Sequence, residues 1–244
     1  MVSSADFEKE LDLFRTEHQA AIQFFYAWRT INSVASRDKT VVNFLDNAPL
    51  MWNTILGGLQ TSTFIALGRV FDVDRNAHSL TRLLSLAHEN LNLFSKESVA
   101  ARKCSQSAMS ADQLEAYLET IYVPTSKDFR RLKQHVRKRR VTYETKYRPI
   151  RHKVFAHREM LNADQVSTLF ALTNVAELEK LLAFLARIYD ALWQLYFNGI
   201  KPSLRPIRFS VENILRQPVR RGRRRTIQER MVVETRSFLK VNSQ

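Results

Sequence analysis

The chain has 244 residues, a net charge of +14 and a 45% hydrophobic fraction, so it is long enough to bury a substantial core. Five glycines and six prolines leave few tight turns for a multi-stranded protein, and the single cysteine, Cys104, excludes an internal disulfide and a thiolate metal site. We therefore expect an all-α protein, an elongated helical bundle with a basic, Pro/Arg-rich C-terminal extension.

No segment resembles a targeting or membrane signal. The first ten residues contain three acids and lack the basic start and apolar run of a secretory signal. The most apolar stretch, Leu181–Phe197, contains Arg187 and Asp190, which are costly inside a bilayer. We expect a buried bundle helix there, no membrane partner, and a cytoplasmic location.

Apolar residues at helical spacing predict a first helix over residues 6–33 and a second from Pro49 to about Phe71, capped by Asn47. Gly57 and Gly58 lie inside the second helix, and each costs about 1 kcal/mol relative to alanine. Close packing of another helix is one reason for a chain to keep them.

The next segment alternates loops and short helices. Residues 72–77 are typical of a loop, and Ser79 is a suitable cap for a helix that ends near Glu89. Residues 95–110 are weakly patterned and predict a mobile connection. Ser110 is a suitable cap for a helix through Thr120.

A basic helix is predicted from Ser126, with one apolar side and cations on its other faces. Pro149 should kink this helix or separate it from a following one, because proline removes a backbone donor. Asn174, with Glu177 three residues later, predicts the start of a long helix that reaches about Gly199.

The positive charge is concentrated in two blocks. Residues 127–158 contain 13 Lys/Arg and two carboxylates, a net charge of +11. Residues 201–230 contain 10 Lys/Arg and two carboxylates, a net charge of +8. The remainder of the chain therefore carries a net charge of −5. Such blocks on an acidic body indicate a polyanion site, and the alternative is two solvated basic faces without a ligand. We expect a helical domain over 1–198 and a basic extension over 199–244, partly disordered or with one peripheral helix.

Side chains suited to phosphate binding and proton transfer are most concentrated between Arg151 and His157. Arginine matches phosphate oxygens and histidine titrates near neutrality, so Arg151, His152 and His157 could hold a phosphodiester and move protons. Arg151 and His157 would lie about 240° apart on an ideal α-helix, so either the helix ends between them or a second subunit completes the site. Alternatively, Arg151 is a solvated cation and His157 a partly buried structural histidine.

The pattern Arg151-His152-(four residues)-His157 resembles the signature of the HEPN superfamily, and the surrounding residues look like its AbiU-like branch, associated with abortive-infection and toxin systems. Residues 66–72 and 79–84 are also similar to that branch, and the similarity covers about residues 6–198. Some relatives have a tyrosine two residues after the histidine, where this chain has Glu159. The resemblance therefore does not imply the tyrosine-modified toxin arrangement of those relatives.

The resemblance implies a helical bundle that dimerises and a metal-independent endoribonuclease or RNA-targeting toxin, with no cofactor and no metal. Arg151 and His157 would be catalytic and His152 supportive, and an antitoxin protein is a further expected partner. The residues expected to contact RNA are Arg137, Arg139, Arg140, Arg148, Lys153 and Arg158.

Two alternatives stay open. Many HEPN members are non-catalytic, so the chain could be a module that only binds RNA or another polyanion. It could also be a scaffolding bundle whose tail docks onto an acidic protein or an anionic membrane. Tyr143 and Tyr147 are candidates for base stacking, with a core position as the leading alternative.

Overall fold

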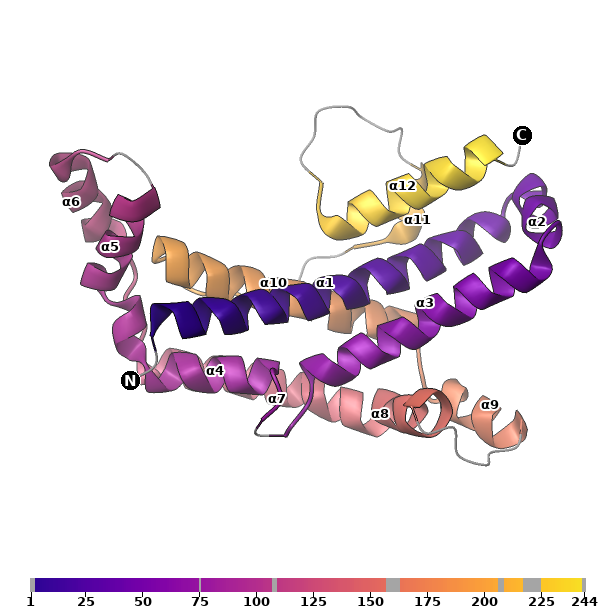
Figure 1. Cartoon of the computed structure of the whole chain (residues 1–244), viewed down its shortest axis with the longest axis horizontal. Helices are drawn as coiled ribbons and strands as arrows, with labels where there is room; N and C mark the ends of the chain where they lie inside the picture. The colour runs from indigo at the N-terminus through magenta and orange to yellow at the C-terminus, as the bar shows by residue number, and fades with distance from the viewer. Residues whose placement is uncertain are drawn as a thin grey trace. The chain divides into compact units, whose positions relative to one another are not determined.

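The structure is a computed structural model that describes residues 3–74, 76–106, 109–156, 163–205, 209–216 and 225–242. Every regular element in these ranges is a helix, which confirms the all-α prediction (Figure 1). The α-helices are α1 Ser4–Ala35, α2 Lys39–Asp46, α3 Pro49–Val70, α4 Leu80–Glu89, α5 Lys96–Gln106, α6 Ala111–Thr120, α7 Ser126–Thr142, α8 Arg148–Ile150, α9 Ala163–Ala171, α10 Val175–Asn198, α11 Val211–Arg216 and α12 Ile227–Asn242. Three short elements differ in type: η1 Leu91–Phe94 is a 3-10 helix, and η2 Tyr143–Tyr147 and η3 Arg151–Ala156 are π-helices.

The chain divides into two compact units, and α1 and α3 each contribute to both. Unit 1 comprises Met1–Thr16, Arg69–Lys146 and Thr173–Ile207. Unit 2 comprises Glu17–Gly68, Tyr147–Leu172 and Arg208–Gln244. The domain boundary expected at residue 199 stays a prediction, but the last helix, α12, is grouped with unit 2.

Unit 1 is built around an aromatic core. In Figure 1, α4 lies along α7 and α5 lies beside α6, and each pair is in contact. Phe94 of η1 contacts Phe7 and Phe129 at centroid distances of 5.5 and 5.2 Å. The guanidinium of Arg102 lies 3.8 Å from the centre of the Tyr196 ring and donates hydrogen bonds to the carbonyl oxygens of Leu93 and Tyr196.

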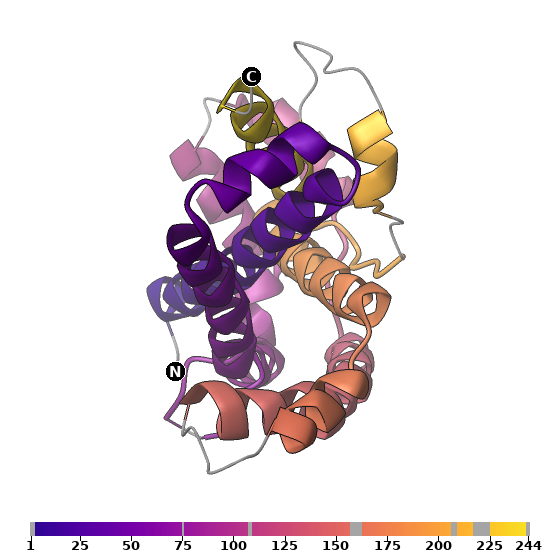
Figure 2. The ribbon, with the colours of Figure 1, turned by 90° about the vertical axis from the view of Figure 1, so that its right-hand side faces the viewer.

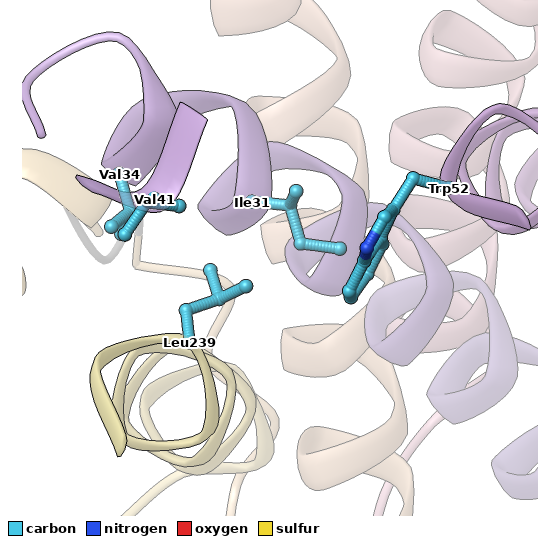
Figure 3. Packing of buried hydrophobic residues seen from close by; sticks show 5 residues of the cluster. All are labelled: Ile31, Val34, Val41, Trp52 and Leu239. Carbon is cyan, nitrogen blue, oxygen red and sulfur yellow. The ribbon is translucent and has the colours of Figure 1, made fainter. Parts of the chain in front are cut away.

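Unit 2 contains a hydrophobic cluster in which the last helix, α12, packs with residues 31–52. Figure 3 shows the members of this cluster, Ile31 and Val34 of α1, Val41 of α2, Trp52 of α3 and Leu239 of α12, and all five side chains are buried. The contact between α12 and α2 belongs to this cluster. The basic extension therefore supplies part of the hydrophobic core of unit 2.

Several helix ends follow the caps expected from the sequence. Ser79 and Ser110 accept hydrogen bonds from the backbone N–H groups of Arg82 and Gln113. Asn174 caps α10 in the same way, and Gly199 ends that helix with a left-handed φ of 57°. Such caps satisfy backbone groups that have no partner within the helix.

Two expectations are wrong. Residues 95–110 contain α5 instead of a mobile connection, and its buried positions are Val99 and Arg102. Because one of these is a charged residue, the helix has no hydrophobic periodicity to reveal it. Asn47 is the C-cap of α2 and does not cap α3. The expectation was wrong because the sequence pattern did not reveal α2, a helix of eight residues.

Candidate functional site

The helical segment that carries Arg151 alternates between α-helix and π-helix. The α-helical ladder of α7 gives way to π-helix η2, then to the three residues of α8, which include Pro149, and then to π-helix η3. Proline cannot donate a backbone hydrogen bond, and the two π segments lie on either side of it. The angular separation expected for Arg151 and His157 assumed an ideal α-helix, so it does not apply to this segment.

Arg151 lies at the first position of η3 and is half-buried. Its Nε atom is buried and has no hydrogen-bond partner among the residues that the structure describes. An unsatisfied buried donor typically costs about 1–3 kcal/mol. The arginine is therefore not simply one more solvated cation.

The Arg151 side chain runs closely against Gly68 of α3. A Cβ added at Gly68 would lie 2.5 Å from Cδ and 2.7 Å from Cζ of Arg151. Both residues belong to unit 2. Two of the sequence segments that carry the family resemblance, the one around Gly68 and the one that begins at Arg151, thus meet at this contact.

An aromatic cluster holds η3 against α3. The ring centroids of Phe64 and Phe155 are 5.2 Å apart, and Phe170 of α9 lies 6.2 Å from Phe155. Tyr147, fully buried, lies 6.2 Å from Phe64. Figures 1 and 2 show α8 and α9, which contact each other in this part of unit 2.

The other predicted residues of the motif differ in exposure. His152 and Arg148 are exposed, and Lys153 is half-buried. His157 and Arg158 lie outside the residues that the structure describes. The structure thus brings together Arg151, His152 and Lys153 on η3, with Arg148 one helical turn before Arg151.

Three predicted RNA contacts belong to α7 in unit 1. Arg137 is exposed, and Arg139 is exposed with its guanidinium 5.6 Å from the centre of the Phe184 ring. Arg140 is half-buried, and its Nε lies 3.2 Å from Oε1 of Glu144. Arg137 and Arg139 therefore offer accessible cations, whereas Arg140 is largely engaged by a neighbouring carboxylate.

Base stacking on Tyr143 or Tyr147 is not supported. Tyr143 is 2% exposed and stacks on Phe71 with ring centroids 5.0 Å apart, and Tyr147 is 0% exposed. Aromatic platforms for bases must be accessible. Both tyrosines are core residues, which was the alternative to base stacking in the sequence analysis.

A hollow of about 250 Å³ in unit 1 was not singled out from the sequence. Arg131 and His135 of α7 line it together with Lys201 and Asp128. Burial by itself would raise the pKa of the Asp128 carboxyl, but hydrogen bonds from Thr125 and Tyr122 and the nearby Lys201 charge lower it. The carboxylate therefore stays ionised close to Arg131 and Lys201, two cations that are distant from one another in sequence.

Gly68 is the main site residue that sequence reasoning missed. The signal was present in the resemblance over residues 66–72, but composition and periodicity cannot say which glycine faces another side chain. The close packing of another helix at Gly57 and Gly58 is not seen, because, apart from the adjoining residues and backbone of α3 itself, no described atom lies within 4 Å of a Cβ added at either position.

Neither a metal centre nor a membrane span is found in the described ranges. No group of three or more His, Cys, Asp or Glu side chains in these ranges is arranged to hold a metal ion. Among the helices of the described part of the chain, none combines the length and the apolar character needed to cross a membrane.

The fold and the motif define a helical protein with the Arg-polar-(four residues)-His signature of HEPN proteins. The family model of AbiU2, a HEPN family, matches residues 4–215, and the chain belongs to this family. Comparison with curated proteins and with solved structures found no match. The match ends before α12.

Proposed function

We propose that the chain is a metal-independent endoribonuclease, a toxin-like protein of abortive infection that cleaves RNA as a cytoplasmic homodimer. The observation that carries this proposal is the half-buried Arg151, whose buried Nε has no partner among the described residues. A buried donor left unsatisfied is unusual in proteins and calls for an explanation other than folding. A phosphate oxygen of a bound RNA is a suitable acceptor.

Arg151 would bind the scissile phosphodiester. Its planar guanidinium offers several donors to phosphate oxygens, and the negative charge on these oxygens grows as the nucleophile attacks. A donor fixed in advance stabilises that charge without reorganisation during the reaction. Contact with Gly68 limits the movement of the side chain.

The histidines would move the protons. His157 removes the proton from the ribose 2′-hydroxyl, the 2′-oxygen attacks phosphorus, and the bond to the 5′-oxygen breaks. His157 of the second protomer donates a proton to that leaving oxygen. The products are a 2′,3′-cyclic phosphate and a 5′-hydroxyl. His152 would support the reaction through a hydrogen bond or a phosphate contact.

Exposed cations would hold the RNA backbone. Arg137 and Arg139 in unit 1 and Arg148 in unit 2 are exposed, and the half-buried Lys153 would add a further phosphate contact. Contacts of this kind release counterions, so affinity should fall as salt rises. An antitoxin protein that masks these cations would inhibit the enzyme.

The test compares an RNA with the same RNA carrying one 2′-deoxy sugar at the scissile position, each with and without excess chelator. Wild type should cleave only the RNA, in chelator as well, and Arg151→Ala and His157→Ala should cleave it at least about 10²-fold more slowly. Arg15→Ala is the control, because Arg15 is exposed and pairs with Asp12 of its own helix. Cleavage of the deoxy substrate, or loss of activity in chelator, would contradict the mechanism. RNA binding without any cleavage would favour the non-catalytic binding module.

A further inference from the structure

Three of the five glycines in the chain lie in one helix, α3, at positions 57, 58 and 68. Glycine weakens a helix because it has more conformational freedom to lose on folding than alanine. Space for a side chain is open at Gly57 and Gly58, where a Cβ would have no described neighbour within 4 Å. Gly68 differs, because a Cβ there would overlap the Arg151 side chain.

The overlap cannot be relieved by moving the two helices apart without disrupting the core between them. Phe64 lies one turn before Gly68 on α3, and Phe155 lies one turn after Arg151 on η3. The Phe64 and Phe155 rings pack at 5.2 Å, and Phe64 is 4% exposed. A methyl group at position 68 would therefore displace the flexible Arg151 side chain and leave the backbone in place.

We propose that Gly68 is a positioning residue for Arg151. The missing side chain leaves a slot on α3 in which the stem of Arg151 lies, with Nε buried and part of the residue still exposed. An arginine side chain has many rotamers in solution, and the slot removes most of them before substrate binds. The consequence for catalysis rests on the proposed function, whereas the slot itself does not.

The substitution Gly68→Ala in the full chain tests this role, with Gly57→Ala and Gly58→Ala as matched controls. All three changes add one methyl group to the same helix. The first readout is the Nε–H resonance of Arg151 in a nitrogen-15 NMR spectrum, assigned by its disappearance in Arg151→Lys. Gly68→Ala should shift this resonance and speed its exchange with water, and neither control should do so.

The second readout is RNA cleavage. Gly68→Ala should lower kcat by about 10²-fold, the effect expected when a catalytic group is misplaced by about 1 Å. The controls should cleave at the wild-type rate. In an Arg151→Ala background, Gly68→Ala should cause no further loss of activity, because residues that act through one contact are not additive.

The outcomes separate this inference from the proposed function. An unchanged Arg151 resonance in Gly68→Ala, or equal shifts in the controls, would overturn the positioning role. A shifted resonance with undiminished cleavage would also overturn it. A shifted resonance in a protein that cleaves no RNA, wild type included, would keep the slot and refute the nuclease. If Gly68→Ala does not fold, the double variant with Arg151→Ala should fold, and its failure would show that Arg151 is not the obstacle.

Discussion

Leu239 should be one of the side chains that hold unit 2 together, although it lies in the basic C-terminal extension. It is fully buried and belongs to one hydrophobic cluster with four other buried residues (Figure 3). Leucine-to-alanine changes in a core cost about 2–5 kcal/mol. Because Leu239 is near the end of α12, the site can partly relax, and we expect Leu239→Ala to lower the free energy of unfolding by roughly 2–3 kcal/mol.

Urea unfolding followed by tryptophan fluorescence measures this destabilisation. Two of the three tryptophans, Trp28 and Trp52, belong to unit 2, so a Trp193→Phe background makes fluorescence a probe of that unit. Phe238→Ala is the control, since Phe238 is 55% exposed and adjacent on α12. It should change stability by no more than about 0.5 kcal/mol. Equal destabilisation in the two variants, or none in Leu239→Ala, would refute the packing of α12 on the rest of unit 2.

Three other predictions concern the proposed catalytic residues, the glycines of α3 and Asp128 of unit 1. Arg151→Ala should lower kcat by about 10²–10³-fold and His157→Ala by about 10²–10⁴-fold, with circular dichroism and light scattering unchanged from wild type. Gly57→Ala and Gly58→Ala should each raise the urea midpoint, by up to about 1 kcal/mol in stability, and a decrease instead would indicate that another surface covers α3. The lowered pKa of Asp128 means that its ionised form stabilises the fold above the unfolded pKa of about 3.9, and that this contribution disappears as pH falls through the lower folded value. The stability difference between wild type and Asp128→Asn should therefore shrink between neutral pH and pH 3, and a constant difference would contradict the assignment.

The parts of the fold that the sequence could predict are those governed by local chemistry. Ser79, Ser110 and Asn174 cap helices because a short polar side chain reaches the free N–H groups of the first turn. Gly199 ends α10 because its left-handed φ favours glycine. The family resemblance similarly rests on local runs of residues, and the match over residues 4–215 confirms it.

The parts that escaped prediction depend on contacts between distant residues. Helix α5 is anchored by a buried arginine, and Arg102 becomes acceptable in a core only because distant carbonyl oxygens and the Tyr196 ring receive its guanidinium. The slot at Gly68 is invisible without knowing that Arg151 crosses it. Neither feature produces a period or a spacing in the sequence.

The charge of the C-terminal extension must be tested separately from its packing. Deleting residues after Gly199 would remove Leu239 from the core, so a weaker RNA affinity in such a variant would mix the effect of charge with that of stability. Replacing Arg220, Arg221, Arg223 and Arg224, which lie outside the described residues, with glutamine in the full chain removes charge alone. If these arginines bind RNA phosphates, the slope of log affinity against log salt should fall by about 0.7 for each phosphate of a single strand that is no longer neutralised. The urea midpoint of unit 2 should not move, since Leu239 stays in place. An unchanged salt slope would show that the run does not bind RNA, and that the extension serves this protein through α12 and its contribution to the core.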